Sequence, residues 1–394
     1  MTIIKPCNEQ EAGEAVAEAA AARIPLALSG NDTKAAIGRP AQSERTLSAS
    51  GLSGVTLYEP AELVIGARAG TSLAEVERTL AERGQQLTFE PIDYRALLGS
   101  IGEPTIGGVA AANLSGPRRI QAGAARDSLI GVRFVNGQGE LVKNGGRVMK
   151  NVTGLDLVKL LGGSWGTLGF LTEVTFKVLP KPERAKTLVL RGLDEAEAAA
   201  AMSAALGSPY EVTAAAHLPA GLGGGAQTLM RLEGFAYSVD YRGGELRRLF
   251  RRYDVDVVEG EASAALWRGV RDVAPFSADT SAEAIWRVST APTKGHVFTA
   301  IVARSMDCRW FYDWGGGLVW LACEPGRDAG ARAVRAAVAD TGGHATLVRA
   351  PAEIRGAVDV FQPMSEPLLR LTAGIKASLD PAWIFSPGRM YAGV

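Results

Sequence analysis

Cysteine is scarce in this sequence of 394 residues, in which Cys7, Cys308 and Cys323 are the only thiols. They lie far apart and show no C-x-x-C spacing, which argues against a disulfide framework and suits a reducing compartment. An iron–sulfur cluster normally takes four cysteine thiolates, so three cannot hold one. We therefore expect a chain without a disulfide framework and without an iron–sulfur cluster of its own.

Histidine is equally scarce, and the sequence has no common metal or nucleotide motif. His217, His296 and His344 are isolated, so none has a second ligand at the H-x-H or H-x-x-x-H spacing of a metal site. The phosphate-loop pattern G-x-x-x-x-G-K-[ST] is also missing, which disfavours a nucleoside triphosphatase. We expect no metal site.

Neither sign of charge is in excess, and no long apolar run occurs. The 42 basic residues balance the 42 acidic ones, so no net field attracts nucleic acid or an anionic membrane. No stretch of about 18 apolar residues is present, and the first ten residues lack the basic and apolar regions of a signal peptide. We expect a cytoplasmic protein, or one held at a membrane only by partner subunits, with no nucleic-acid partner and no direct membrane insertion.

The chain is long enough for two or three domains, and residues 180–184 mark the clearest boundary. Two prolines and three charged residues there interrupt every periodic pattern. We predict one domain over residues 1–180 and an α+β domain over 181–394. The main predicted elements are helices over 9–23, 72–84, 155–161, 194–206 and 330–340, strands over 25–28, 55–58, 63–67, 85–89, 170–179 and 228–235, and a hairpin over 133–142.

Two glycine motifs match catalytic patterns without the required context. Residues 221–226 fit the dinucleotide pattern G-x-G-x-x-A, but a strand follows them where a helix is needed. Residues 162–166 fit the nucleophile-elbow pattern around Ser164, but here a helix precedes the turn and a strand follows it. We interpret the first as a mobile loop and the second as a turn or a place of close ligand approach.

Three glycine-rich segments precede residue 180, at 29–34, at 105–116 and at 162–169, and the last contains the second of these motifs. Glycine lets the backbone approach a flat or anionic ligand closely, and successive amides in such loops form anion-binding nests. Glycine also marks ordinary turns, and each segment alone is explained in that way. Together they predict a site for a pyrophosphate-linked cofactor.

Read in order, these segments resemble the PCMH-type FAD-binding domain of the vanillyl-alcohol oxidase family. The resemblance covers about residues 2–180 and is most specific in the third segment and the strand after it. The motifs that carry it are Tyr58-Glu59-Pro60-Ala61-Glu62-Leu63-Val64, Ala69-Gly70-Thr71, Thr105-Ile106-Gly107-Gly108, Arg126-Asp127, Lys150-Asn151, Gly154-Leu155-Asp156-Leu157 and the run from Gly163 to Val174.

The second half of the chain is similar to the FAD-binding E subunits of bacterial glycolate oxidases. The motifs concerned are Ile285-Trp286-Arg287-Val288-Ser289, Asp313-Trp314-Gly315-Gly316, Gly342-Gly343-His344-Ala345-Thr346 and Phe385-Ser386-Pro387-Gly388-Arg389-Met390-Tyr391. This resemblance implies an α+β fold, in which a PCMH-type two-subdomain FAD-binding domain precedes an α+β cap domain whose C-terminal segment returns toward the flavin. It also implies a complex that oxidises glycolate to glyoxylate, with a larger FAD-linked subunit and an iron–sulfur subunit as partners.

The resemblance also implies which residues bind FAD. Those of 29–34 would surround the pyrophosphate with backbone amides, those of the second segment would line the flavin, and Phe170 and Leu171 would meet the adenine end. The full set is Ser29, Gly30, Asn31, Asp32, Thr33, Lys34, Thr105, Ile106, Gly107, Gly108, Asn113, Ser115, Gly116, Arg126, Asp127, Gly169, Phe170 and Leu171.

The sequence departs from related proteins at three places. Many relatives carry in the first loop a histidine that bonds covalently to the flavin, whereas this loop has Asn31 and Asp32, so we expect non-covalent FAD. The paired-histidine metal motif of related D-2-hydroxyacid dehydrogenases is missing from the cap, which argues against independent hydroxyacid oxidation. Ser386 stands where relatives usually have asparagine before the proline.

Oxidation of a small 2-hydroxyacid needs a cation for the carboxylate and a base for the hydroxyl. Arg287, Arg304 and His344 of the cap are the candidates. One alternative is a non-catalytic subunit that uses FAD as an electron relay or for assembly while a partner holds the substrate. Another is a free-standing oxidase or dehydrogenase of a different 2-hydroxyacid or of an alditol.

Overall fold

The computed structural model describes residues 2–40, 42–146, 154–277 and 282–393. At the amino terminus, three parallel strands form a small sheet in the order β1, β3, β2, and helix α1 connects β1 to β2. Asn8 caps α1, because its side-chain oxygen accepts a hydrogen bond from the Glu11 N–H at 2.9 Å. The bounds are β1 Thr2–Ile4, α1 Glu9–Ala22, β2 Leu26–Ser29 and β3 Arg45–Ser48.

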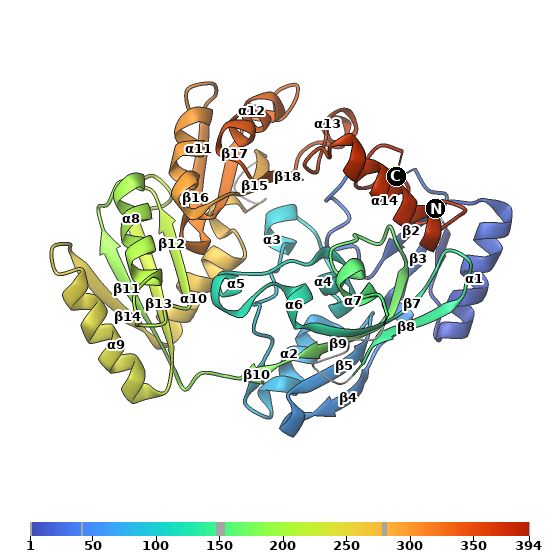
Figure 1. Cartoon of the computed structure of the whole chain (residues 1–394), viewed down its shortest axis with the longest axis horizontal. Helices are drawn as coiled ribbons and strands as arrows, with labels where there is room; N and C mark the ends of the chain where they lie inside the picture. The colour runs from blue at the N-terminus through green and yellow to red at the C-terminus, as the bar shows by residue number, and fades with distance from the viewer. Residues whose placement is uncertain (1, 41, 147–153, 278–281, 394) are drawn as a thin grey trace.

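A five-stranded antiparallel sheet of order β4, β5, β9, β7, β8 forms the second layer of this half (Figure 1). Helix α4 packs on strands β5 and β9, and it brings the second glycine segment onto this sheet. The strands are β4 Val55–Glu59, β5 Val64–Arg68, β7 Leu129–Val135, β8 Leu141–Gly145 and β9 Phe170–Lys177, and the helices are α2 Leu73–Ala81, α3 Arg95–Leu98, α4 Ile106–Ala112, α5 Arg119–Ala122, α6 Ala125–Ser128 and α7 Leu157–Leu161.

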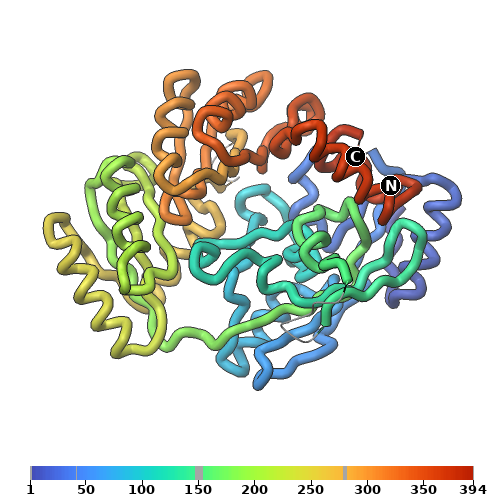
Figure 2. Tube along the Cα trace, in the orientation of Figure 1, coloured from blue at the N-terminus to red at the C-terminus, as the bar shows by residue number. Residues whose placement is uncertain are grey.

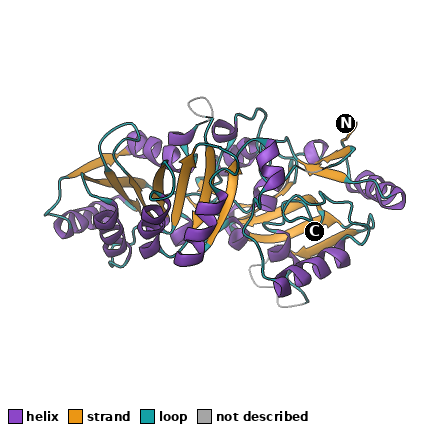
Figure 3. Cartoon of the chain, turned by 90° about the horizontal axis from the view of Figure 1, so that it is seen from above, coloured by secondary structure: helices purple, strands orange, loops and turns teal. Residues whose placement is uncertain are grey.

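An eight-stranded sheet of order β14, β11, β13, β12, β16, β17, β15, β18 builds the second half (Figure 3). Leu188 and Leu190 of β11 face one layer of the core with helices α8 and α9, whereas Thr187 and Val189 face helix α10 on the other side. The strands are β11 Arg184–Arg191, β12 Ala214–Leu218, β13 Gln227–Gly234, β14 Val255–Glu259, β15 Ala284–Ser289, β16 Cys308–Asp313, β17 Leu318–Cys323 and β18 His344–Arg349, and the helices are α8 Glu195–Leu206, α9 Ala236–Leu249, α10 Gly260–Arg271, α11 Gly295–Val302, α12 Ala331–Thr341, α13 Ala352–Ala357 and α14 Glu366–Leu379.

The chain passes between the two halves near Pro180 and returns at its carboxyl end (Figure 2). Leu26 of β2 donates its N–H to the Ile384 carbonyl at 2.7 Å and accepts from the Ser386 N–H at 2.8 Å. The fully buried pair of Lys376 and Asp380 anchors α14 beside this contact, with a nitrogen–oxygen distance of 2.7 Å. The carboxyl-terminal segment is therefore fixed to the amino-terminal half.

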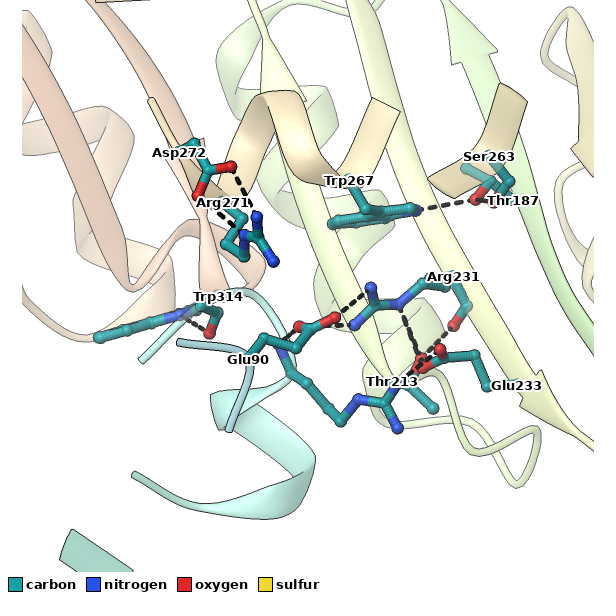
Figure 4. A network of polar contacts seen from close by, with 12 residues as sticks. Glu90, Thr187, Thr213, Arg231, Glu233, Ser263, Trp267, Arg271, Asp272 and Trp314 are labelled. Carbon is teal, nitrogen blue, oxygen red and sulfur yellow. Dashed lines mark hydrogen bonds and ion pairs between the residues drawn. The ribbon is translucent and has the colours of Figure 1, made fainter. Parts of the chain in front are cut away.

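A buried ionic network also joins the halves (Figure 4). Arg231 of β13 donates to both carboxylate oxygens of Glu90, at 2.7 and 2.9 Å. Glu233, on the same strand, accepts from Arg118 of the first half at 2.5 Å. Because buried charges are tolerated only with partners, this paired set fixes the second half against the first.

The helices and strands predicted from the sequence agree with the main elements of the structure, but the bounds of several of them differ. Residues 85–89 form only the two-residue strand β6 (Gln85–Gln86), which pairs with β10 (Leu179–Pro180). Phe89 instead packs against Phe176 in the core, at 5.4 Å between ring centroids. The motif Lys150-Asn151 lies outside the described residues. Within the described ranges, no helix combines the length and apolar character needed to cross a membrane.

Candidate functional site

The three glycine segments meet in one cleft of the amino-terminal half. Measured out to its open mouth, the cleft contains about 710 Å³ of empty space. Its walls come from the loop after β2, helix α4, the start of β9 and the carboxyl-terminal segment. They consist of Leu28, Ser29, Gly30, Asn31, Asp32, Thr33, Lys34, Ala35, Ala49, Ala69, Thr105, Gly107, Gly108, Ala111, Ala112, Trp165, Gly166, Gly169, Phe170, Leu171 and Arg389.

The first segment, residues 29–34, leaves β2 at the carboxyl end of the parallel sheet. The backbone N–H groups from Asn31 to Lys34 have no hydrogen-bond partner in the part of the chain that the structure describes. Asp32 has a φ of 57°, which turns the backbone in the manner of an anion-binding nest. The segment is held from outside the cleft, because the Ser48 hydroxyl donates to the Gly30 carbonyl at 2.7 Å. Such free amides suit a phosphate.

The second segment reaches the cleft through the first turn of α4. Thr105 caps this helix and accepts a hydrogen bond from the Gly108 N–H at 3.2 Å. A Cβ on Gly107 would lie 2.6 Å from the Cβ of Ala69, so this glycine lets α4 approach the end of β5. A Cβ on Gly108 would meet only the Thr105 hydroxyl, at 3.1 Å. Gly107 therefore serves the packing of the fold, whereas Gly108 keeps the cleft wall flat.

The third segment forms the turn between α7 and β9 and supplies an apolar wall. Gly169, Phe170 and Leu171 line the cleft where β9 begins, together with Trp165 from the turn. Ser164, at the centre of the hydrolase-like motif, is buried in this turn. The segment can therefore contact the flat, uncharged parts of a cofactor.

Two cations stand in the cleft wall beside the free amides. Arg389 donates to the carbonyls of Lys34 and Ile37, at 3.2 and 3.4 Å, which links the carboxyl-terminal segment to the first loop. Burial lowers the pKa of Arg389 to about 10, so the guanidinium stays charged at neutral pH. Burial also lowers the pKa of Lys34, to about 8. A pyrophosphate bound here would lie close to positive charge as well as to amide donors.

Six predicted cofactor residues lie outside the cleft lining, and most have structural partners. The Asn113 side chain accepts from the Arg126 N–H at 2.9 Å, and the Ser115 hydroxyl accepts from the Ala125 N–H at 2.8 Å. These bonds join the end of α4 to the start of α6. The complete set is Ile106, Asn113, Ser115, Gly116, Arg126 and Asp127, of which Ile106 is buried in the core, Gly116 bonds to the cap and Asp127 caps α6.

The structure separates the three catalytic candidates. Arg287 on β15 and His344 on β18 lie within electrostatic range of each other. Desolvation, and then the positive charges of Arg287 and of Arg119, lower the pKa of His344. Arg304 is instead exposed in the turn after α11, where only its backbone hydrogen bond to Ile301 is seen among the described residues.

Three residues of this region make contacts that the sequence did not predict. Arg389 belonged to a recognised carboxyl-terminal motif, but only the tertiary fold shows that it enters the cleft. Ser386, which replaces the usual asparagine, accepts from the Leu28 N–H at 3.1 Å and so holds the strand that leads into the first loop. Arg119 was not predicted, because no local pattern distinguishes it from Arg118, which forms an ion pair with Glu233.

Comparisons with known proteins agree with this geometry. Residues 2–145 match the family model described as FAD binding domain. Over 398 aligned residues, covering 99% of both chains, the sequence is 35% identical to glycolate oxidase subunit GlcE of Escherichia coli. It is 30% identical over 188 residues to glycolate oxidase subunit GlcD of Bacillus subtilis, covering 48% of this chain and 38% of that protein.

The fold is shared with a solved oxidase of low sequence similarity. The 4-ethylphenol oxidase of Gulosibacter chungangensis superposes with a TM-score of 0.74 at 14% identity, over 99% of this chain and 89% of that one. At this identity the likeness concerns the fold alone. The arrangement is that of the PCMH-type FAD-binding domain with a following α+β cap.

Proposed function

Because the chain belongs to the family of FAD-binding glycolate oxidase subunits that includes the E subunit of Escherichia coli, we propose that it binds FAD in a complex that oxidises glycolate to glyoxylate. The proposed partners are a larger FAD-linked subunit and an iron–sulfur subunit. An iron–sulfur centre of this complex would lie in a partner, since a chain with three thiols cannot ligate a four-cysteine cluster.

The convergence of three distant glycine segments on one cleft is the observation that carries this proposal. In it, the free amides from Asn31 to Lys34 would take the FAD pyrophosphate, and the Arg389 guanidinium would offset its charge. The flat surface at Gly108 and the apolar wall at Phe170 would hold the ring systems. No covalent link is expected, since the first loop offers Asn31 and Asp32 and no histidine.

When bound, FAD supplies the acceptor for the hydride equivalent that leaves the substrate carbon. The residues of this chain would then bind and orient the hydroxyacid and hold the hydroxyl proton. His344 is the proposed proton acceptor. Its lowered pKa keeps the imidazole neutral at physiological pH, as a base requires.

Anaerobic addition of glycolate tests the assignment. We expect the flavin absorption band of the complex to bleach, and bleaching of the isolated full chain would place oxidation in this subunit. If the flavin band of the complex bleaches and that of the isolated chain does not, the result favours the alternative hypothesis, in which this chain relays electrons. Peroxide production by the chain alone would favour a free-standing oxidase.

Affinity capture of the tagged chain from its native host tests the partners, with the two named subunits expected together.

A further inference from the structure

Two arginines from different halves of the chain stack on the same indole. Arg119 of α5 and Arg287 of β15 place their guanidinium carbons 4.3 and 4.9 Å from the ring centroid of Trp314. Trp314 is buried, and its ring N–H donates to the Gly116 carbonyl at 3.0 Å. The indole is therefore fixed at the junction of the two halves, and it carries one cation from each half, within electrostatic range of each other.

Neither guanidinium has an anionic partner at ion-pair distance within the described ranges. The Nε atom of Arg287 is buried and makes no hydrogen bond to any described residue. Asp313 is a carboxyl group that influences Arg287, but burial raises the pKa of Asp313 to about 7, so it offsets the cation only in part. Two cations thus share a site that lacks matching negative charge.

Three neighbouring arginines differ from this pair in having a carboxylate partner. Arg118 pairs with Glu233, Arg231 pairs with Glu90, and Arg271 pairs with Asp272 at 2.7 Å (Figure 4). A buried donor without a partner costs free energy, and each of these three arginines has a carboxylate partner that offsets it, although the Nε atom of Arg118 also lacks a hydrogen-bond partner among the described residues. The buried Nε atom of Arg287 has no such partner, and exposed Arg119 stacks on the same indole, which leaves both cations available to an anion from outside the chain.

We propose that Arg119 and Arg287 bind the carboxylate of the hydroxyacid substrate, with Trp314 as the platform that orients both. Guanidinium groups present fork-like donors that match a carboxylate in two-point contacts. The site adjoins the end of the second glycine segment, because Trp314 bonds to Gly116, four residues after the cleft-lining Ala112. This inference rests on the proposed function and adds which residues recognise the acid group.

Binding of oxalate, a dicarboxylate with no hydroxyl to oxidise, tests the site in the full-length protein. Calorimetry reports this binding whether or not flavin is present, so it does not depend on the proposed function. We expect Arg119→Met and Arg287→Met each to weaken oxalate binding at least tenfold and to raise the KM for glycolate far more than they change kcat. Arg287→Lys should restore part of the affinity, because it keeps the charge but loses the fork.

Controls distinguish a loss of carboxylate binding from a defect in folding or in cofactor binding. The flavin content of the variants should equal that of the parent protein, and Arg332→Met, at an exposed cap position on α12, should leave oxalate binding unchanged. Arg119 is itself exposed, so its substitution is expected to fold even if that of Arg287 does not. Unchanged oxalate affinity in a folded Arg119→Met protein, or no oxalate binding by the parent, would overturn the proposal. Loss of flavin from the parent alone would overturn only the proposed function.

Discussion

Arg231 of the cap holds Glu90 of the flavin-binding half in a two-point ion pair, with nitrogen–oxygen distances of 2.7 and 2.9 Å. Burial alone would raise the pKa of Glu90, but the charges of Arg231 and Arg118 and their hydrogen bonds to the carboxylate together outweigh it and keep the pKa below its ordinary value of 4.5. The pair is the centre of the network that fixes the second half of the chain against the first (Figure 4).

Replacing Glu90 with Gln should destabilise the protein by about 3 kcal/mol, because it leaves the Arg231 cation buried without its partner. Since the folded pKa of Glu90 is lowered, its contribution is present above about pH 4.5 and is lost as the pH falls through the folded value. Denaturant unfolding at pH 7 and at lower pH measures both effects. Glu261→Gln, in an exposed pair with Arg268, is the control and should cost about 1 kcal/mol or less. Equal losses from the two variants would contradict the role of the network.

Replacing Gly108 with Val should abolish FAD retention while the protein stays folded. A Cβ at this position meets only the Thr105 hydroxyl, at 3.1 Å, so the rest of the Val side chain should extend into cofactor space instead of the core. Flavin absorbance after gel filtration and circular dichroism together measure the result. Gly244→Val on the exposed face of α9 has no neighbour within 4 Å and should retain flavin. A yellow Gly108→Val protein would show that this wall does not face the cofactor.

FAD affinity should fall as the pH rises through about 8. Burial lowers the pKa of Lys34 to about 8, so the ammonium that would attract the pyrophosphate is present below that pH and is lost above it. One proton is involved, so the decline should not exceed about tenfold per pH unit. Fluorescence titration of the apoprotein between pH 7 and 9.5 measures it, and Lys34→Met should give a weaker, flat profile. A parent profile as flat as that of the variant would exclude Lys34 from phosphate binding.

Replacing Asp380 with Asn should weaken both the fold and FAD binding. Lys376 and Asp380 are fully buried, and the Lys376 ammonium also donates to the carbonyls of Thr167 and Phe385. We expect a loss of about 3 kcal/mol in the free energy of unfolding, and a rise in the dissociation constant of FAD because the segment that carries Arg389 loosens. Glu366→Gln at the exposed start of α14 should change neither. A destabilised Asp380→Asn variant with unaltered FAD affinity would show that the carboxyl-terminal segment does not contribute to FAD binding.

The sequence alone was sufficient to predict those elements whose ends are set by interactions between residues close in the chain. Asn8 and Asp194 mark helix starts through their caps, and the predicted helices over 9–23 and 194–206 differ from α1 and α8 by one residue at one end. The predicted strand over 85–89 runs three residues past the end of β6, because Phe89 is buried by tertiary packing and not by strand pairing. Apolar character alone does not distinguish these two cases.

The three glycine segments that the sequence singled out line one cleft, whereas two arginines of the region were not predicted as site residues. The glycine segments marked the loops, since a backbone that must approach a ligand closely favours that residue. Arg389 and Arg119 escaped notice because the function of an arginine depends on whether a carboxylate stands beside it in the fold. Arg118 and Arg119 are adjacent in sequence, yet only the first pairs with Glu233.

The flavin content of the full chain, purified under native conditions, tests the central claim most directly. If main chain from residues 29–34, 105–108 and 166–171 forms one cofactor cleft, the protein will carry about one FAD per chain. Acid precipitation will release that FAD completely, as a non-covalent cofactor requires. A folded, colourless protein that takes up no added FAD would contradict the account.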